Sequence, residues 1–148
     1  MDPRKRALMG SAWRDRFKQR HKALPGHFYA CDLDLALVSK RPPGVVAFVD
    51  YKHPRDHITF AEVLLYNVLA QVGRVYIVRG PLDGPFEVYR YLEGDPGPNP
   101  PVVRLEKVRA CADWREFAAW EAELRKRYRE VRHGRQVGEV EDDGQTAG

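Results

Sequence analysis

The segment from His27 to His53, HFYACDLDLALVSKRPPGVVAFVDYKH, constrains the fold most, because it predicts two strands joined by a tight turn. Asp32 and Asp34 alternate with Cys31, Leu33 and Leu35 in its first half, whereas Val45–Val49 in its second half is a continuous apolar run. A run of that kind is typical of a strand covered on both faces. The Arg-Pro-Pro-Gly segment between the two halves supplies the turn. We therefore expect a β-hairpin whose second strand lies inside a sheet.

Charged residues gather at the open end of this predicted hairpin. Asp32 and Asp34 are two positions apart, as are Asp50 and Lys52, so each pair shares one face of its strand. Folding the hairpin about its turn places position 34 opposite position 50 or 51. Carboxylates that converge in this way repel one another until a proton or a cation relieves the repulsion.

A divalent metal ion would suit this cluster. Mg²⁺ binds one or two carboxylates and keeps its other positions for waters and substrate phosphates. Bound there, Mg²⁺ or Mn²⁺ polarises a phosphate and lowers the pKa of a bound water, which is the chemistry of phosphodiester hydrolysis. A simpler interpretation stays open, in which Asp32 and Asp34 are turn or edge polarity and the Asp50-Tyr51-Lys52 segment takes part in a cross-strand ion pair. Burying such charges uncompensated is costly, so we favour a functional site.

The residues Val49-Asp50-Tyr51-Lys52 resemble the V-D-Y-K signature of RecB-type nuclease domains, which belong to the PD-(D/E)XK nuclease superfamily. The resemblance covers about residues 12–92. It implies an α/β, restriction-endonuclease-like core with a mixed central sheet flanked by helices in the order α-β-β-α-β. It also implies that Asp34 and Asp50 bind the metal and that Lys52 assists the attacking water. Asp32 is a further candidate metal ligand.

Residues 4–22 predict a basic helix. Residues 1–26 contain eight Arg and Lys residues against two Asp residues. The helix is either a solvated surface or a face that contacts nucleic-acid phosphates, with Arg14 and Lys18 as candidates. In one respect the chain departs from the family: many members carry a glutamate on this helix, and residues 1–61 contain none.

Residues 59–72 predict a second helix, buried against the sheet, that begins with a capping box from Thr59 to Glu62. Capping explains Glu62, so this residue is not assigned to the site. The weaker candidates for nucleic-acid contact are Tyr66 on this helix and two residues of the preceding loop, His53 and Arg55. Each also has an ordinary structural explanation.

The remaining chain predicts three strands and one helix. Residues 74–79 should form a strand parallel to one hairpin strand, because a helix connects them. Residues 86–92 should form an antiparallel neighbour, followed by a proline-rich loop over 93–101 and a short strand over 102–108. Asp113 should cap an extra C-terminal helix with an apolar stripe, made of Phe117, Trp120, Leu124, Tyr128 and Val131. We expect one domain over residues 1–133 and a disordered acidic tail over 134–148.

Composition sets broader limits. With 43% hydrophobic and 31% charged residues, the chain is typical of globular proteins, and we expect no membrane span or signal peptide. The two distant cysteines, Cys31 and Cys111, fit a reducing cytoplasmic setting. The preferred hypothesis is a Mg²⁺- or Mn²⁺-dependent deoxyribonuclease, with a protein partner or DNA structure supplying any specificity. The alternative is a catalytically inactive member of the fold that binds nucleic acid or protein. The sequence distinguishes neither DNA from RNA nor endonuclease from exonuclease.

Overall fold

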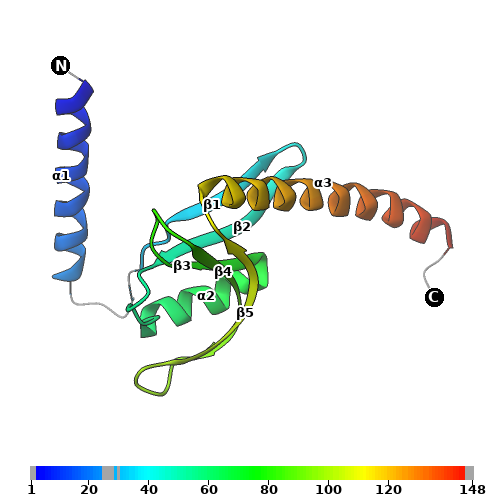
Figure 1. Cartoon of the computed structure of the whole chain (residues 1–148). Coiled ribbons are helices and arrows are strands. Elements are labelled where there is room, and N and C mark those ends of the chain that lie inside the picture. The colour runs from blue at the N-terminus through cyan, green and yellow to red at the C-terminus, as the bar shows by residue number, and fades with distance from the viewer. Residues whose placement is uncertain (1–2, 25–28, 30, 146–148) are drawn as a thin grey trace. The chain divides into compact units, whose positions relative to one another are not determined.

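The computed structural model describes residues 3–24, 29 and 31–145, and the side chains of residues 10–24, 29 and 31–131 (Figure 1). The elements in chain order are α1 (Pro3–Lys22), β1 (Leu35–Lys40), β2 (Pro43–Lys52), α2 (Phe60–Val72), β3 (Arg74–Arg79), β4 (Phe86–Asp95), β5 (Val102–Cys111) and α3 (Trp114–Gln145). Contacts divide the chain into two compact units, Met1–Cys31 and Asp32–Gly148, where the sequence predicts one domain.

The first unit consists mainly of α1, which spans the residues expected from the sequence. Its last turn carries Arg20, His21 and Lys22. Cations in the last turn of a helix interact favourably with the partial negative charge of its terminal carbonyls.

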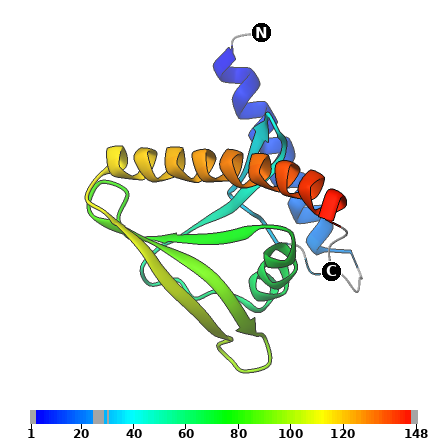
Figure 2. The same cartoon turned by 90° about the vertical axis from the view of Figure 1, so that its right-hand side faces the viewer.

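The second unit is built on a five-stranded mixed sheet in the order β1-β2-β3-β4-β5 (Figure 2). The β1–β2 pair is the expected hairpin, and β2 and β3 are parallel, as the intervening helix predicts. β4 pairs antiparallel with β3 and with β5. The α/β class and the mixed sheet are therefore confirmed. Strands β4 and β5 both end three residues later than expected, and the longer β4 shortens the proline-rich loop between them.

The start of the hairpin differs from the prediction. β1 begins at Leu35, so the prediction that Asp32 and Asp34 alternate within the first strand is wrong. Asp34 lies at a bend directly before the strand, and its Oδ2 accepts the backbone N–H of Tyr51 at 2.8 Å. A side-chain oxygen thus accepts from the β2 backbone at the point where the strand ladder ends.

The two faces of the sheet are covered by different helices. α3 packs on one face, where a buried cluster includes Val49, Tyr76 and Phe86 from the sheet and Phe117 and Trp120 from the helix. The rings of Tyr76 and Trp120 meet edge to face with centroids 4.9 Å apart. α2 packs on the other face, as expected for helices on both sides.

Helix α2 covers its face less completely than its composition predicts. Its capping box is present as expected, with Thr59 Oγ1 accepting from the Glu62 N–H at 3.3 Å. Glu62, Val63 and Tyr66 are buried, but Val68 and Val72 are 60% and 67% exposed. The predicted burial of the helix against the sheet is therefore confirmed for one side of the helix, and the other side is exposed. A single helix layered on a sheet buries one side only.

Helix α3 begins as predicted, because Asp113 Oδ1 accepts the N–H of Glu116 at 3.0 Å. Its first turns bury Phe117, Trp120 and Leu124, whereas Val131 is exposed. The backbone stays helical to Gln145, through residues that composition predicts to be disordered. This segment contains no proline, and its Glu, Gln and Arg residues have good helix propensity. Residues 146–148 lie outside the described range. Among the described residues, no helix combines the length and apolarity needed to cross a membrane.

Candidate active site

Two of the predicted metal ligands meet at the open end of the hairpin. Leu35 lies opposite Val49, so the register places Asp34 beside Asp50, as predicted. The Asp34 backbone N–H donates to Asp50 Oδ1 at 3.0 Å. Together with the bond from Tyr51 to Asp34, this contact fixes the two aspartates against each other. Asp50 is buried near the end of β2, and Asp34 is exposed at the bend.

The environment of Asp50 favours its protonated form. Burial raises the pKa of this carboxyl group, and the neighbouring Asp34 carboxylate raises it further. Hydrogen bonds from the Tyr66 hydroxyl and the Asp34 N–H act in the opposite direction without overcoming the effect of burial. A buried carboxylate beside a second carboxylate is a position that a cation stabilises.

Helix α2 supplies two further polar groups to this cluster. The Tyr66 hydroxyl donates to Asp50 Oδ2 and lies 3.2 Å from Glu62 Oε2. The other oxygen of Glu62 accepts the Thr59 N–H at 2.9 Å, and Glu62 Oε2 forms an ion pair with the Lys52 ammonium. The chain Asp34–Asp50–Tyr66–Glu62–Lys52 is therefore one continuous network, called the carboxylate network below.

Glu62 is the site residue that the sequence analysis missed, because the capping box already explained it. The structure shows that capping uses one carboxylate oxygen and the network uses the other. The spacing held a usable signal. Glu62 and Tyr66 are four residues apart, and therefore lie on the same side of the helix, towards the sheet. A second signal came from Lys52, because a lysine near the end of a buried strand is stabilised by an acidic partner, and Glu62 is that partner.

The proton inventory of the network is consistent with the raised pKa of Asp50. The Tyr66 hydroxyl has one proton but lies within hydrogen-bond distance of carboxylates from Asp50 and Glu62. Both contacts are satisfied together when one of the two acids carries a proton. Lys52 stabilises the charge on Glu62, and burial raises the pKa of Asp50, which is the direction that this contact pattern requires.

The donor set fits Mg²⁺ or Mn²⁺ in number and kind. Among the described residues, no three His, Cys, Asp or Glu side chains form a ready-made metal group. Mg²⁺ does not require one, because it commonly uses one or two carboxylates and takes its other ligands from water and phosphate. Asp34 and Asp50 supply two carboxylates, and their binding of a metal ion stays a prediction. Asp32 is exposed in the segment before β1, and its role as a third ligand stays a prediction.

The other predicted contact residues are distributed differently. Tyr66 lies at the centre of the carboxylate network. His53 and Arg55 are exposed in the loop after β2, where the Arg55 N–H donates to the His53 Nδ1 at 3.3 Å. Arg14 and Lys18 belong to α1 in the other unit, so their contact with nucleic acid stays a prediction.

Comparisons with known proteins give no relative for this chain. No protein-family model matches it, and no curated protein or solved structure shows significant similarity.

Proposed function

We propose that this chain is a metal-dependent nuclease that hydrolyses phosphodiester bonds in DNA, and that residues 1–133 have a restriction-endonuclease-like fold. The observation that carries the proposal is the convergence of Asp34 and Asp50, with Lys52 two residues further along the same strand. The resemblance of Val49–Lys52 to the RecB-type signature supports the same reaction. The element order α1, β1, β2, α2, β3 agrees with the order in that superfamily.

Each residue of the network has a role in this proposal. Asp34 and Asp50 would hold the metal ion, which when bound supplies a polarised phosphate and a more acidic water. The Asp34 N–H and the Tyr66 hydroxyl orient the buried Asp50 carboxylate. Glu62 holds the Lys52 ammonium at the end of β2, where it can position the attacking water or stabilise charge on the phosphate.

The test is cleavage of labelled single- and double-stranded DNA in Mg²⁺, Mn²⁺ or EDTA. We expect cutting by the wild-type chain in either metal and none in EDTA. Asp50→Asn and Lys52→Met should each lower the rate by about 10³-fold, the range for losing a group that acts in the transition state. Asp83→Asn and Lys40→Met remove equal charges at exposed positions and should keep the wild-type rate.

Equal activity in all four variants would assign the cutting to another site or to a contaminant. Absence of cutting in every form, together with retained DNA binding, would favour the non-catalytic nucleic-acid-binding alternative. Calorimetry with Mn²⁺ adds a separate readout, because the Asp50→Asn variant should lose metal affinity whether or not DNA is cut.

A further inference from the structure

Arg79 lies one strand away from the lysine of the proposed active site. It ends β3, and the parallel register places it beside Lys52 at the end of β2. Val75 and Ile77 of β3 pack on the α2 face, so the period of two puts Arg79 on that face as well. Phe48 of β2 packs there too, which puts Lys52 on the same side. Neighbouring strands are about 4.8 Å apart, so the side chains of Lys52 and Arg79 start from adjacent positions on the same face of the sheet.

The backbone around Arg79 is held firmly. The Tyr51 hydroxyl donates to the carbonyl of the next residue, Gly80, at 2.6 Å. Gly80 has a φ of +137°, and a Cβ there would lie 2.7 Å from the Phe86 Cα. Only glycine fits this close approach between the end of β3 and the start of β4. The position from which the Arg79 side chain departs is therefore well defined.

The Arg79 guanidinium is incompletely paired. One terminal nitrogen donates to the Asp56 carbonyl at 3.3 Å, whereas the buried Nε–H has no hydrogen-bond partner among the described residues. The residue opposite on β4 is Glu87, but its carboxylate accepts from Lys107 at 2.8 Å and from Tyr89. Those two contacts lower the pKa of Glu87. A buried N–H left unpaired costs free energy, which a ligand would recover.

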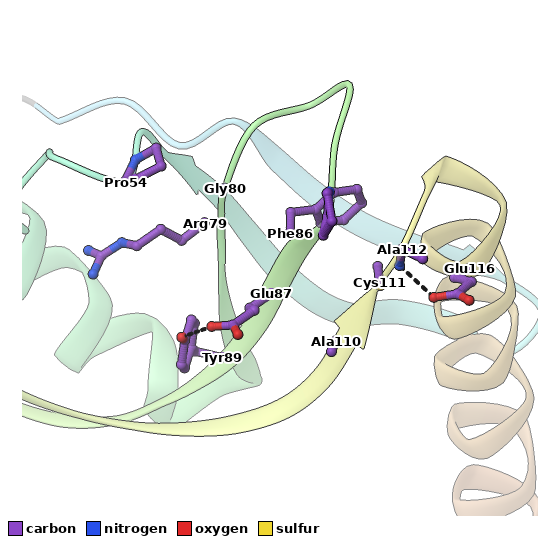
Figure 3. Close-up of a pocket in the computed structure, with 11 residues that line it drawn as sticks. Pro54, Arg79, Gly80, Phe86, Glu87, Tyr89, Ala110, Cys111, Ala112 and Glu116 are labelled. Carbon is purple, nitrogen blue, oxygen red and sulfur yellow. Dashed lines mark hydrogen bonds between the residues drawn. The ribbon is translucent and has the colours of Figure 1, made fainter.

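Two hollows meet at this side chain. Both are bounded by Pro54 and Arg79. The first has a volume of about 510 Å³ and extends to Glu87 and Cys111, and the second, of about 230 Å³, lies against the loop over residues 54–58. Figure 3 shows the Arg79 side chain extending away from Phe86 and Cys111, with the bonded Glu87–Tyr89 pair beside it. A group that enters either hollow therefore meets the Arg79 guanidinium, and the Glu87 carboxylate that lines the first hollow is already bonded to Tyr89 and Lys107.

We propose that Arg79 binds a backbone phosphate of the nucleic-acid strand, next to the phosphate that is cleaved. This inference rests on the proposed nuclease function. Arginine presents a planar fork of N–H donors that matches a phosphate, and hydrogen bonds between charged groups are stronger than those between neutral ones. One strand of B-DNA carries a phosphate for about every 3.4 Å of helix axis. A strand that places one phosphate at Asp50 and Lys52 thus brings the following phosphate within reach of Arg79.

The experiment measures DNA binding in EDTA, where cleavage does not interfere. Fluorescence anisotropy with labelled oligonucleotides gives the Kd over a range of salt concentrations. Arg79→Met should weaken binding roughly tenfold, as expected for losing one well-placed phosphate contact. The slope of log K against log salt should fall by about 0.9 on duplex and about 0.7 on single strands. Arg74→Met removes the same charge at the exposed start of β3 and should change the Kd less than about twofold, because salt screens distant charges.

Wild-type affinity and slope in Arg79→Met would overturn the proposal, as would equal losses in Arg74→Met. If Arg79→Met does not fold, Arg79→Lys decides the matter. That variant keeps the charge and loses the fork, so it should bind more weakly than wild type with an unchanged slope, and wild-type affinity would contradict the assignment. Failure here leaves the cleavage test untouched, since a nuclease that does not use Arg79 still loses activity in Asp50→Asn.

Discussion

The two faces of the sheet differ in what they bury. On the α3 face the buried contacts are apolar and largely aromatic, as in the Tyr76–Trp120 and Phe86–Phe117 ring pairs. The α2 face carries Asp50 and Glu62, the two charged residues that are buried among the described residues. Both helices have a capped N-terminus, and each packs on its face of the sheet through a short apolar stripe. The difference therefore lies in side-chain chemistry and not in architecture.

The α3 face therefore contributes mainly to stability, whereas the α2 face carries the buried charged groups. Apolar burial stabilises without needing any partner of fixed geometry. Buried carboxylates stabilise nothing unless each finds a donor or a cation, so the α2 face needs the carboxylate network merely to offset desolvation. A cluster kept at such a cost is typical of a site that binds or reacts, which agrees with the proposed function.

The largest expected effect lies on the α3 face. Trp120→Ala should lower the free energy of unfolding by about 3–5 kcal/mol, because it removes a buried ring that contacts Tyr76 and Phe117 and leaves a cavity. Urea denaturation measures this loss. Cleavage by the folded fraction at low temperature should stay at the wild-type rate. A rate that falls further than the folded fraction would show that the two faces are not independent.

A smaller change in stability, with a larger change in activity, is expected on the α2 face. Tyr66→Phe should cost about 1–3 kcal/mol, because the buried Asp50 oxygen loses its donor. Its cleavage rate should fall at least roughly tenfold, since Asp50 loses one of the groups that orient it. The matched control is Tyr91→Phe, which removes a buried hydroxyl that donates to Asn67 Oδ1 at 2.6 Å on the same face. That control should lose stability without losing activity, and similar rates in both variants would separate Tyr66 from the chemistry.

The smallest expected effect is a change in the pH dependence of stability, measured without metal. The pKa of Asp50 is raised in the folded chain, so the folded state holds a proton that the unfolded state releases. This contribution to stability is complete below the ordinary pKa of an aspartate and is lost as pH rises through the raised value. Asp50→Asn lacks the effect, so the difference between its free energy of unfolding and that of wild type should shift in favour of the variant as the pH rises above about 4. Asp83→Asn is the control, and parallel profiles for wild type and Asp50→Asn would contradict the shift.

The sequence was sufficient for the hairpin, for the parallel strand after α2 and for the meeting of Asp34 with Asp50. These follow from local patterns, because alternation and turn residues set a register that then fixes which positions are opposite each other. The starting point of β1 was not predictable in this way. Leu33 and Asp34 continue the alternating pattern of a strand. The Asp34 side chain, however, accepts a hydrogen bond from the Tyr51 backbone N–H, and β1 begins only at Leu35.

The role of Glu62 in the carboxylate network could not be predicted from the sequence, because it depends on the tertiary structure. Its capping function was complete in the sequence, whereas its contact with Lys52 depends on how far α2 is displaced across the sheet. The exposed valines of α2 were missed for a related reason. Composition shows how apolar a helix is, but the number of layers above the sheet decides how many of its sides are buried.

The order of the strands has a consequence for how the chain folds. Each strand after the first is adjacent in the sheet to the strand that precedes it in the sequence, and three of the four connections between neighbouring strands are short. Such a sheet needs few contacts between residues far apart in the chain, and a low contact order is associated with rapid folding. The β2–β3 pair is the exception, because α2 separates its two strands in the chain, and we expect this pair to form more slowly than the hairpins. The last pairing to form would then be the one that sets Arg79 beside Lys52.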